Sequence, residues 1–387
     1  MPLFLTDEQR SIKETIKRFT EKEIFPVRAK LDENEEYPES ILKKLSLELG
    51  MGCPCIPQEY DGAGLGILES ALIAEEISRG CLGVSTAYSV TGLGIYPILK
   101  HGSEELKKRF LPDVAKGRKT AAFALTESCA GSDIKSIQTT AVKKGDYYIL
   151  NGVKQWITGA SRSDIYVIFA ITDRSRGIRG ISCFVVEKDT NGLSFSANEK
   201  KLGIKCTETR EVILDECKIP IQNVVGKLGH AFMYAMETFD HSRAVVAASA
   251  IGLSQGALEI ALQYSTERVQ FDNPISSLQA IQHLLADMSI KVESGRHLAY
   301  TAARMVDMNC PELSKYAAMA KCYCGENAFW IVNSAIQILG GYGYMKDYPL
   351  EKMLRDARIL SIYEGTTEIQ KNVIAHELIK ERKRKKG

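Results

Sequence analysis

The chain has 387 residues, of which 45% are hydrophobic and 25% are charged, and its formal net charge at pH 7 is only +2. This length is sufficient for two or three packed units, and the composition is that of an ordinary soluble globular protein. A near-neutral charge gives no reason to expect a nucleic acid or a membrane surface as a partner. The one concentrated basic run, Lys380 to Lys386, is expected to be a solvated C-terminal tail.

Targeting signals and metal-binding patterns are not evident. No apolar run approaches the ~20 residues of a membrane span, so none is expected. The N-terminus has no signal peptide or transit segment, which predicts a cytoplasmic bacterial protein, or a mitochondrial matrix protein if a transit peptide has been removed. The ten cysteines form no CxxC pair, and the six histidines form no H-E-x-x-H motif. We therefore expect reduced, mostly buried thiols and no bound metal.

The first third of the sequence has the pattern of α-helices. Thr6 and Gln9 form a capping box, after which Ile12, Ile16 and Phe19 fall on one helical face. Further helices are expected at Pro38 to Glu48, at Leu68 to Ser78, at Val84 to Lys100 and after the capping residue Ser103. Residues 1–119 are therefore predicted to form an N-terminal helical domain.

The pattern changes near residue 120 to short β-branched and aromatic runs. Strands are expected at Ala121 to Leu125, Tyr147 to Asn151, Ile165 to Ile171 and Ile181 to Val186. Turns are expected at Gly145, Asn151-Gly152 and Asn191-Gly192. These signals predict a middle β domain over residues 120–228, resembling a β-barrel.

Helical periodicity returns after that point and continues to the end of the chain. Long helices are expected at Ala231 to Ser265, Leu278 to Met308 and Glu312 to Leu339, with two shorter helices following. Long helices with few breaks are typical of a bundle. Residues 229–387 are therefore predicted to form a C-terminal four-helix bundle, and the fold class is α+β with several domains.

Nucleotide-binding signatures are incomplete. Gly62, Gly64 and Gly66 resemble a glycine fingerprint, but Ile67 follows them, no strand is predicted before them, and GxGxxG therefore fails. A Walker A loop is absent. Any bound flavin or nicotinamide must be held by something other than a Rossmann fold.

Four segments have residue types that suit a ligand, although each also has a purely structural interpretation. The segment Ala124 to Asp133 is a turn dense in small hydroxyl residues, and Lys154 to Thr158 contains one of only two tryptophans. The glycines of Gln337 to Tyr344 either end a helix or let backbone approach a ligand. In Tyr363 to Gln370, Thr367 and Gln370 predict a second capping box, and Glu364 lies just before this helix start.

Taken together, these segments resemble the acyl-CoA dehydrogenase family over nearly the whole chain. Residues 124–136 match A-L-T-E-x-x-A-G-S-D-x-x-S, and residues 337–356 match Q-x-x-G-G-x-G-Y-x-x-D-x-x-x-x-K-x-x-x-D. Both matches are complete and occur in the family's order. The resemblance implies an enzyme that uses FAD to oxidise an acyl-CoA to its 2-enoyl-CoA, with Glu364 removing the α-proton and hydride passing to the flavin.

The resemblance also implies roles for individual residues. The residues expected to contact FAD within the subunit are Phe123, Leu125, Thr126, Ser132, Trp156 and Thr158. Those expected to reach the FAD of a neighbouring subunit are Arg268, Phe271, Gln337, Gly340 and Gly341, with Thr366 and Glu368 at its adenine–diphosphate end. The residues expected to contact the acyl-CoA are Ser132, Phe232, Asp240, Arg243, Tyr363 and Gly365, with Ser85, Tyr88 and Ser89 at the base of the acyl pocket. The expected partners are an electron-transfer flavoprotein and other copies of the chain, as a homotetramer.

Two positions narrow the expected branch of the family. One branch carries its base just before the CoA-binding arginine, where this chain has Ser242, which cannot serve as a base. The glutaryl-type branch carries an arginine in the acyl pocket, matched here by Ser85, and residues 82–99 contain no basic residue. An uncharged short, medium-length or alicyclic acyl group is therefore expected. The direction of the reaction stays open, since an enoyl-CoA reductase would have the same sequence features; an oxidase or a nucleic-acid-associated relative is a weaker alternative.

Overall fold

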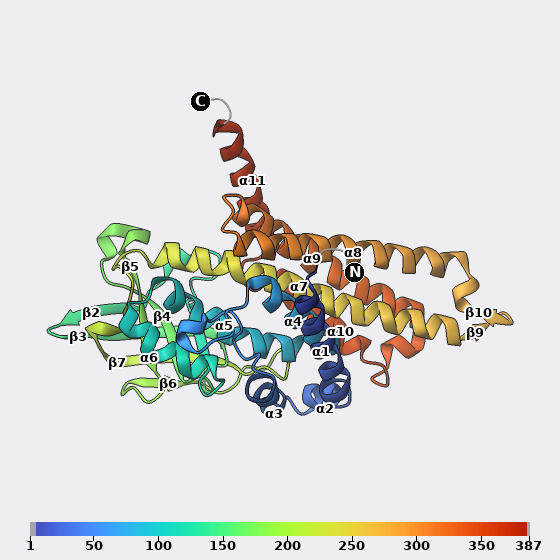
Figure 1. Cartoon of the computed structure of the whole chain (residues 1–387), viewed down its shortest axis with the longest axis horizontal. Helices are drawn as coiled ribbons and strands as arrows, with labels where there is room; N and C mark the ends of the chain where they lie inside the picture. Colours follow the sequence, from blue (N-terminus) through green and yellow to red (C-terminus); the bar gives the residue numbers. More distant parts are fainter. Residues whose placement is uncertain (1–4, 385–387) are drawn as a thin grey trace.

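The computed structural model describes residues 5–384. The chain forms three consecutive units: α-helices, then a β-sheet, then long α-helices that extend across the molecule (Figure 1). The sheet lies at one end of the molecule, and the β9–β10 hairpin (Val269–Gln270 and Asn273–Pro274) lies at the opposite end. This order of helical, sheet and helical units confirms the predicted fold class.

The N-terminal unit contains six α-helices among the described residues. They are α1 (Asp7–Phe19), α2 (Arg28–Glu33), α3 (Glu39–Lys43), α4 (Ile67–Gly80), α5 (Leu82–His101) and α6 (Glu104–Ala115). The predicted capping box is present, because Thr6 Oγ1 accepts from the Gln9 backbone N–H at 3.2 Å and Gln9 Oε1 accepts from the Thr6 N–H at 3.0 Å. Ser103 caps α6 as predicted, through the Leu106 N–H.

The middle unit is a single mixed sheet. Its strands are β1 (Ala121–Ala124), β2 (Thr140–Lys144), β3 (Tyr147–Thr158), β4 (Ile165–Ile171), β5 (Ile181–Glu187), β6 (Leu193–Phe195), β7 (Thr209–Pro220) and β8 (Val224–Val225). Their spatial order is β6-β7-β3-β2-β4-β5-β8, and β1 pairs in parallel with β4. β1 and β4 are buried along their whole length, which explains why both read as unbroken apolar runs.

The predicted turn at Asn151-Gly152 is wrong. β3 continues through these residues to Thr158, and its pairing with β7 shifts register between Leu150 and Gly152. Gly152 has φ +150°, and a Cβ there would lie 2.4 Å from Thr139 Oγ1. Asparagine and glycine therefore mark a β-bulge here, because both a turn and a bulge require a backbone that glycine tolerates.

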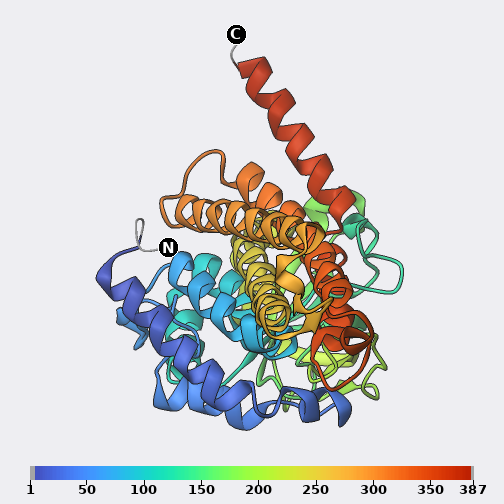
Figure 2. The same ribbon diagram turned by 90° about the vertical axis from the view of Figure 1, so that its right-hand side faces the viewer.

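The C-terminal unit is built on three long helices. Its helices are α7 (Ala231–Glu267), α8 (Gln279–Asp307), α9 (Leu313–Leu339), α10 (Leu350–Ala357) and α11 (Thr367–Arg384). Figure 2 shows α11 projecting away from the other helices. The cap of α11 differs from the prediction, since Thr366 Oγ1 accepts from the Ile369 N–H and Thr367 is the first helical residue. The basic tail is helical to Arg384, and its last residues, 385–387, lie outside the described range.

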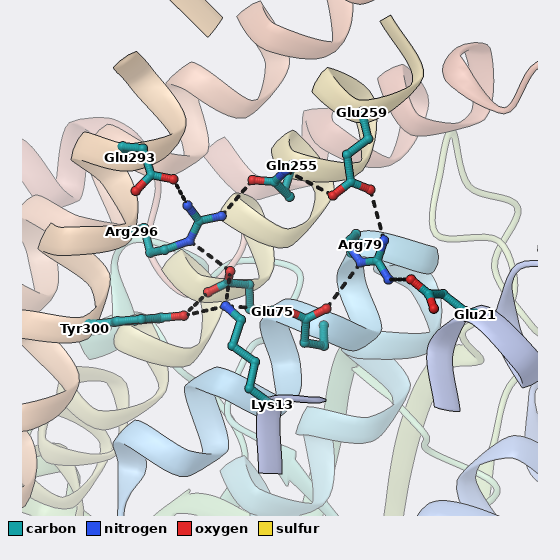
Figure 3. A network of polar contacts seen from close by, with 10 residues as sticks. Lys13, Glu21, Glu75, Arg79, Gln255, Glu259, Glu293, Arg296 and Tyr300 are labelled. Carbon is teal, nitrogen blue, oxygen red and sulfur yellow. Dashed lines mark hydrogen bonds and ion pairs between the residues drawn. The ribbon is translucent and has the colours of Figure 1, made fainter. Parts of the chain in front are cut away.

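The helical units are joined by close packing and by buried charges. A Cβ at Gly252 of α7 would lie 1.9 Å from the Glu75 carbonyl oxygen of α4, so only glycine permits this approach. Figure 3 shows the ion-pair network that includes Glu75. Glu75 accepts from Lys13 of α1 at 2.8 Å, from Arg296 of α8 at 3.0 Å and from Tyr300 of α8 at 2.6 Å. The carboxylate of Glu75 thus ties together three helices that are distant in sequence.

Two of the described helices are long and apolar enough, by length and composition alone, to cross a membrane. They are α5 and α7, with mean hydropathies of 1.2 and 1.6 over their most apolar windows. Each window is 67% buried inside the fold. Buried core helices of soluble proteins have the same length and hydropathy.

Candidate active site

Glu364 lies in the short loop between α10 and α11. Its φ is +52°, an uncommon conformation for a residue other than glycine, and Gly365 follows at φ +92°. Lys321 Nζ of α9 donates to the Gly365 carbonyl oxygen at 2.6 Å, and Gln370 Nε2 donates to the Glu364 carbonyl oxygen at 3.2 Å. A strained backbone held by several contacts is typical of functional sites, and here it fixes the position of one carboxylate.

The carboxylate of Glu364 faces α7. The hydroxyl of Ser242 donates to Glu364 Oε2. Burial raises the pKa of Glu364, while the Ser242 hydrogen bond and the charges of Lys321 and Arg243 lower it; the net result is a raised pKa. A raised pKa brings a carboxylate closer to the pH at which a general base is most effective.

Glu364 lines a cavity between the N-terminal helices and α7. The lining residues are Gly52, Cys53, Pro54, Cys55, Ile67, Ser70, Tyr88, Ser89, Gly92, Leu93, Tyr96, Thr238, His241, Ser242, Val245, Val246 and Glu364. Tyr88 and Ser89, predicted for the acyl pocket, are among them. Ser85 is not: it is fully buried, and its hydroxyl bonds the Ala74 carbonyl oxygen at 3.0 Å and Ser249 Oγ at 3.0 Å. His241 and Tyr96 were not predicted from the sequence, because tertiary packing brings them to the cavity.

Arg243 and Asp240 lie next to this site on α7. Arg243 is 4% exposed and donates to Asp240 Oδ1 at 2.8 Å. The second oxygen of Asp240 accepts from Ser314. Arg243 Nη2 would lie 3.6 Å from a Cβ at Gly365, so the guanidinium also packs against the loop that carries Glu364. Phe232 lies in the first turn of the same helix, and Tyr363 directly precedes Glu364.

The sheet presents a second group of predicted residues. Trp156 is 57% exposed and has φ +56°, at a register shift between β3 and β7. An exposed tryptophan in a strained backbone is not explained by folding alone, and its ring suits a planar ligand such as a flavin. Thr126 and Thr158 are half-buried, and Ser132 is exposed. Phe123 and Leu125 are buried in a core shared with α7.

A third group lies at the far end of the long helices, around the β9–β10 hairpin. Arg268, Phe271, Gly340 and Gly341 line one open depression, and Phe271 is 84% exposed. A Cβ at Gly340 or Gly341 would meet no atom within 4 Å, so open space adjoins this backbone. Gln337 is exposed one turn earlier on α9, and Thr366 and Glu368 lie separately at the start of α11. The exposed ring and open backbone fit the nucleotide part of a dinucleotide cofactor approaching from outside the subunit.

Some signature residues have structural partners. Glu127 is buried and accepts from Lys154 Nζ at 2.7 Å and from Thr139 Oγ1 at 2.6 Å, which fixes the turn after β1 against β3. Asp356, also buried, accepts from Lys352 and from the Ile204 N–H, which fixes α10 against the sheet unit. These charges hold the framework of the site together, because a buried charge is tolerated only when it is paired.

An arginine-rich groove was not predicted from the sequence. Arg174, Arg176 and Arg179, in the segment between β4 and β5, line it together with Leu228 and Gly229, just before α7. From Ala231 to Ser242, α7 rises roughly 16 Å at 1.5 Å per residue. One helix therefore leads from a positively charged groove to the Glu364 cavity.

Comparisons with known proteins agree with this arrangement. The acyl-CoA dehydrogenase N-terminal, middle and C-terminal domain models match residues 6–118, 122–217 and 229–379. The acryloyl-CoA reductase (NADH) of Anaerotignum propionicum is 42% identical, covering 98% of this chain and 96% of that protein. Butyryl-CoA dehydrogenase from Megasphaera elsdenii has a TM-score of 0.95 at 37% identity, covering 98% of this chain and 100% of that one.

A chain in a structure of the electron transferring flavoprotein of Acidaminococcus fermentans also has a TM-score of 0.95, at 41% identity, covering 98% of this chain and 99% of that one. The protein belongs to the acyl-CoA dehydrogenase family, whose model domains match most of the chain. It is an FAD-dependent oxidoreductase of that family.

Proposed function

We propose that this protein oxidises an uncharged acyl-CoA to the 2-enoyl-CoA, with Glu364 as the base. The observation that carries the proposal is the Glu364 carboxylate, which lines a cavity, has a raised pKa and is held by Ser242. An α C–H next to a thioester is weakly acidic, so its removal needs a positioned base and a polarised carbonyl group. This chain supplies the base from the loop before α11.

Each residue of the site has a distinct task. The carboxylate of Glu364 takes the α-proton, and its own backbone N–H is expected to polarise the thioester carbonyl oxygen. When bound, FAD supplies the acceptor for the β-hydrogen, which leaves as hydride. Trp156 and Thr158 would cover it from the sheet, and Arg268 and Phe271 of another copy would reach it from the far end of the long helices. Arg243 and Lys321 hold the loop that carries the base.

The coenzyme A part of the substrate is proposed to run along α7. Arg174, Arg176 and Arg179 supply positive charge suited to its phosphates, and Phe232 lies between this groove and the Asp240–Arg243 pair. No lysine or arginine lines the Glu364 cavity itself. A second carboxylate on the acyl group would therefore lack a counter-ion, which argues against a glutaryl-type substrate.

The test is anaerobic mixing of the FAD-loaded protein with a panel of acyl-CoAs, followed by flavin absorbance. Uncharged acyl-CoAs should bleach the flavin, and glutaryl-CoA should do so more slowly. Glu364→Gln should retain FAD but lose roughly 10²–10⁴-fold in bleaching rate, which is the usual contribution of a general base. If the variant bleaches within tenfold of the wild-type rate, Glu364 is not the base.

The reverse reaction is a second candidate, favoured by the 42% identity to an acryloyl-CoA reductase. The same geometry serves it, because a protonated Glu364 would return the proton to the α-carbon. The test is to reduce the flavin chemically and add an enoyl-CoA. Reoxidation faster than the forward bleaching would assign the reductase direction, and an electron-transfer flavoprotein is the proposed electron partner in either direction.

A further inference from the structure

The wall of the Glu364 cavity contains an unusual concentration of unpaired polar atoms. Among residues 5–384, seven buried side-chain nitrogen or oxygen atoms have no hydrogen-bond partner. Three of them, Tyr88 Oη, Ser89 Oγ and His241 Nδ1, belong to residues that line this one cavity. A buried polar atom left unpaired costs about 1–3 kcal/mol, so three together need an explanation beyond chance.

The state of His241 is defined by its neighbour. Tyr96 Oη lies 2.5 Å from His241 Nε2, which leaves Nδ1 as the unpaired nitrogen. Burial and the charge of Lys100 lower the pKa of His241 to about 3, so the ring is neutral at physiological pH. A neutral imidazole and two hydroxyls offer hydrogen bonds without a charge. They suit a ligand group that is polar and uncharged.

Gly92 gives a second, independent reason to expect a ligand at this wall. It lies in the interior of α5, three residues after Ser89 and four after Tyr88, and therefore on the same helical face. A glycine in a helix interior costs about 0.5–1 kcal/mol relative to alanine. A Cβ at Gly92 would meet no atom within 4 Å, so protein packing does not require the glycine. The missing side chain leaves room beside the unpaired hydroxyls.

We propose that the acyl group of the natural substrate carries an uncharged hydrogen-bonding substituent, namely a hydroxyl group, which Tyr88, Ser89 and His241 bind in the space beside Gly92. This inference rests on the proposed function, since it assigns the substrate class of the same site. A hydroxyl both donates and accepts, as do the two protein hydroxyls. A site built to bind a hydroxyl discriminates strongly against the analogue that lacks it, by up to roughly 10⁴–10⁵-fold.

The test uses pairs of substrates that differ by one hydroxyl group. One pair is 3-phenylpropanoyl-CoA and 3-(4-hydroxyphenyl)propanoyl-CoA; the other is hexanoyl-CoA and 6-hydroxyhexanoyl-CoA. The FAD-loaded wild-type protein should show kcat/KM at least tenfold higher for the hydroxylated member of one pair. Equal or higher kcat/KM for the apolar member of both pairs would overturn the inference. If no acyl-CoA in the panel bleaches the flavin, the proposed function itself fails, which is a different result.

Variants of the wall assign the selectivity to these residues. In the Tyr88→Phe/Ser89→Ala variant, the ratio of kcat/KM between the hydroxylated and apolar members should fall at least tenfold. The matched control is Thr20→Val, which removes an unpaired buried hydroxyl that does not belong to the cavity lining; its ratio should equal that of the wild type. A ratio that is unchanged in the double variant would contradict the assignment. The wild-type substrate pairs still decide the proposal if the double variant does not fold.

Discussion

The hydroxyl of Ser242 donates a hydrogen bond to the carboxylate of Glu364, although 122 residues separate the two in sequence. These are the two positions at which different branches of the family are expected to carry the base. The fold brings both to one cavity wall, on α7 and on the loop before α11. Of the two, only Glu364 has a side chain that can act as a base, and Ser242 is hydrogen-bonded to it.

The pH dependence of turnover should report this hydrogen bond. In the proposed mechanism Glu364 works as a carboxylate, so activity should be lost as pH falls through its raised pKa. Ser242→Ala removes a hydrogen bond that favours the charged form, which raises the pKa further. The acid limb of the profile of kcat against pH should therefore move to higher pH. Ser249→Ala, on the same helix but bonded to Ser85, is the control and should leave the limb in place.

A base at position 242 should partly replace the one at 364. Glu364→Gln alone removes the proposed base. Ser242→Glu/Glu364→Gln places a carboxylate at position 242, the other partner in the Ser242–Glu364 hydrogen bond. We expect the double variant to bleach at least tenfold faster than Glu364→Gln with one of the acyl-CoAs. Equal rates for the two variants, with FAD content equal to that of the wild type, would show that a carboxylate at position 242 does not reach the α-carbon of the substrate.

The arginine groove should act on the nucleotide end of the substrate. Arg176→Ala/Arg179→Ala should raise KM for an acyl-CoA about tenfold or more, since a hydrogen bond to a charged group is worth about 1.5–3 kcal/mol. KM for the corresponding N-acetylcysteamine thioester, which lacks the phosphates, should stay within twofold. Arg18→Ala, which removes an arginine that is 70% exposed on α1, is the control. An equal rise for both substrates would contradict phosphate binding in this groove.

The ion pairs of Glu75 should make the stability of the fold depend on pH in the acidic range. Burial raises the pKa of Glu75, but Lys13 and Arg296 outweigh burial and lower it to about 2. The pKa of Glu75 is lower in the folded protein than the ordinary value of 4.5, so its negative charge stabilises the fold above about pH 4.5. This stabilisation is lost as the pH falls towards 2. Glu75→Gln should destabilise the fold at pH 7 by up to about 3–5 kcal/mol. Lys13 and Arg296 would each lose one of their carboxylate partners and keep only Glu76 and Glu293, respectively.

The measurement is the thermal midpoint of Glu75→Gln and wild type between pH 7 and pH 3. The difference between the two midpoints should shrink as pH falls, since the wild type loses the same charge. Glu14→Gln changes an exposed pair on α1, with 3.9 Å between Arg18 Nε and Glu14 Oε1, and should shift the midpoint little. A constant difference at all pH values would refute the linkage.

The exposed ring of Phe271 should contribute to assembly. We propose a homotetramer in which Arg268 and Phe271 reach the FAD of a neighbouring copy. Phe271→Ser should lower the FAD content after gel filtration and shift sedimentation towards smaller species. A residue that is 84% exposed contributes little to the folding of its own subunit and is free to contact another copy. Leu47→Ser, at a residue that is 57% exposed on the N-terminal unit, should change neither quantity. A stable, FAD-saturated monomer in the wild type would contradict the proposal.

Local signals predicted most elements of the fold correctly. The capping box at Thr6 and Gln9, the strand Ile165–Ile171 and the long helix beginning at Ala231 depend on residues close together in sequence. The errors occurred where one local pattern serves two structures. Asn151-Gly152 marks a bulge in β3 where a turn was expected, and Thr366 caps α11 where Thr367 was expected. In both cases neighbouring strands or the adjacent loop decided the outcome.

The sequence by itself determined the family and singled out Glu364 as the candidate base, because Glu364 and the two signature segments are contiguous patterns of residue types. Tertiary structure alone decided what surrounds that base. His241 and Ser242 on α7 and Lys321 on α9 come from two separate stretches of the chain, and only the packing of α7 and α9 around the loop brings Ser242 and Lys321 to Glu364. Burial and the pairing of polar atoms arise from such long-range contacts. The raised pKa of Glu364 and the unpaired polar atoms in the wall of its cavity therefore have no signature in the linear sequence.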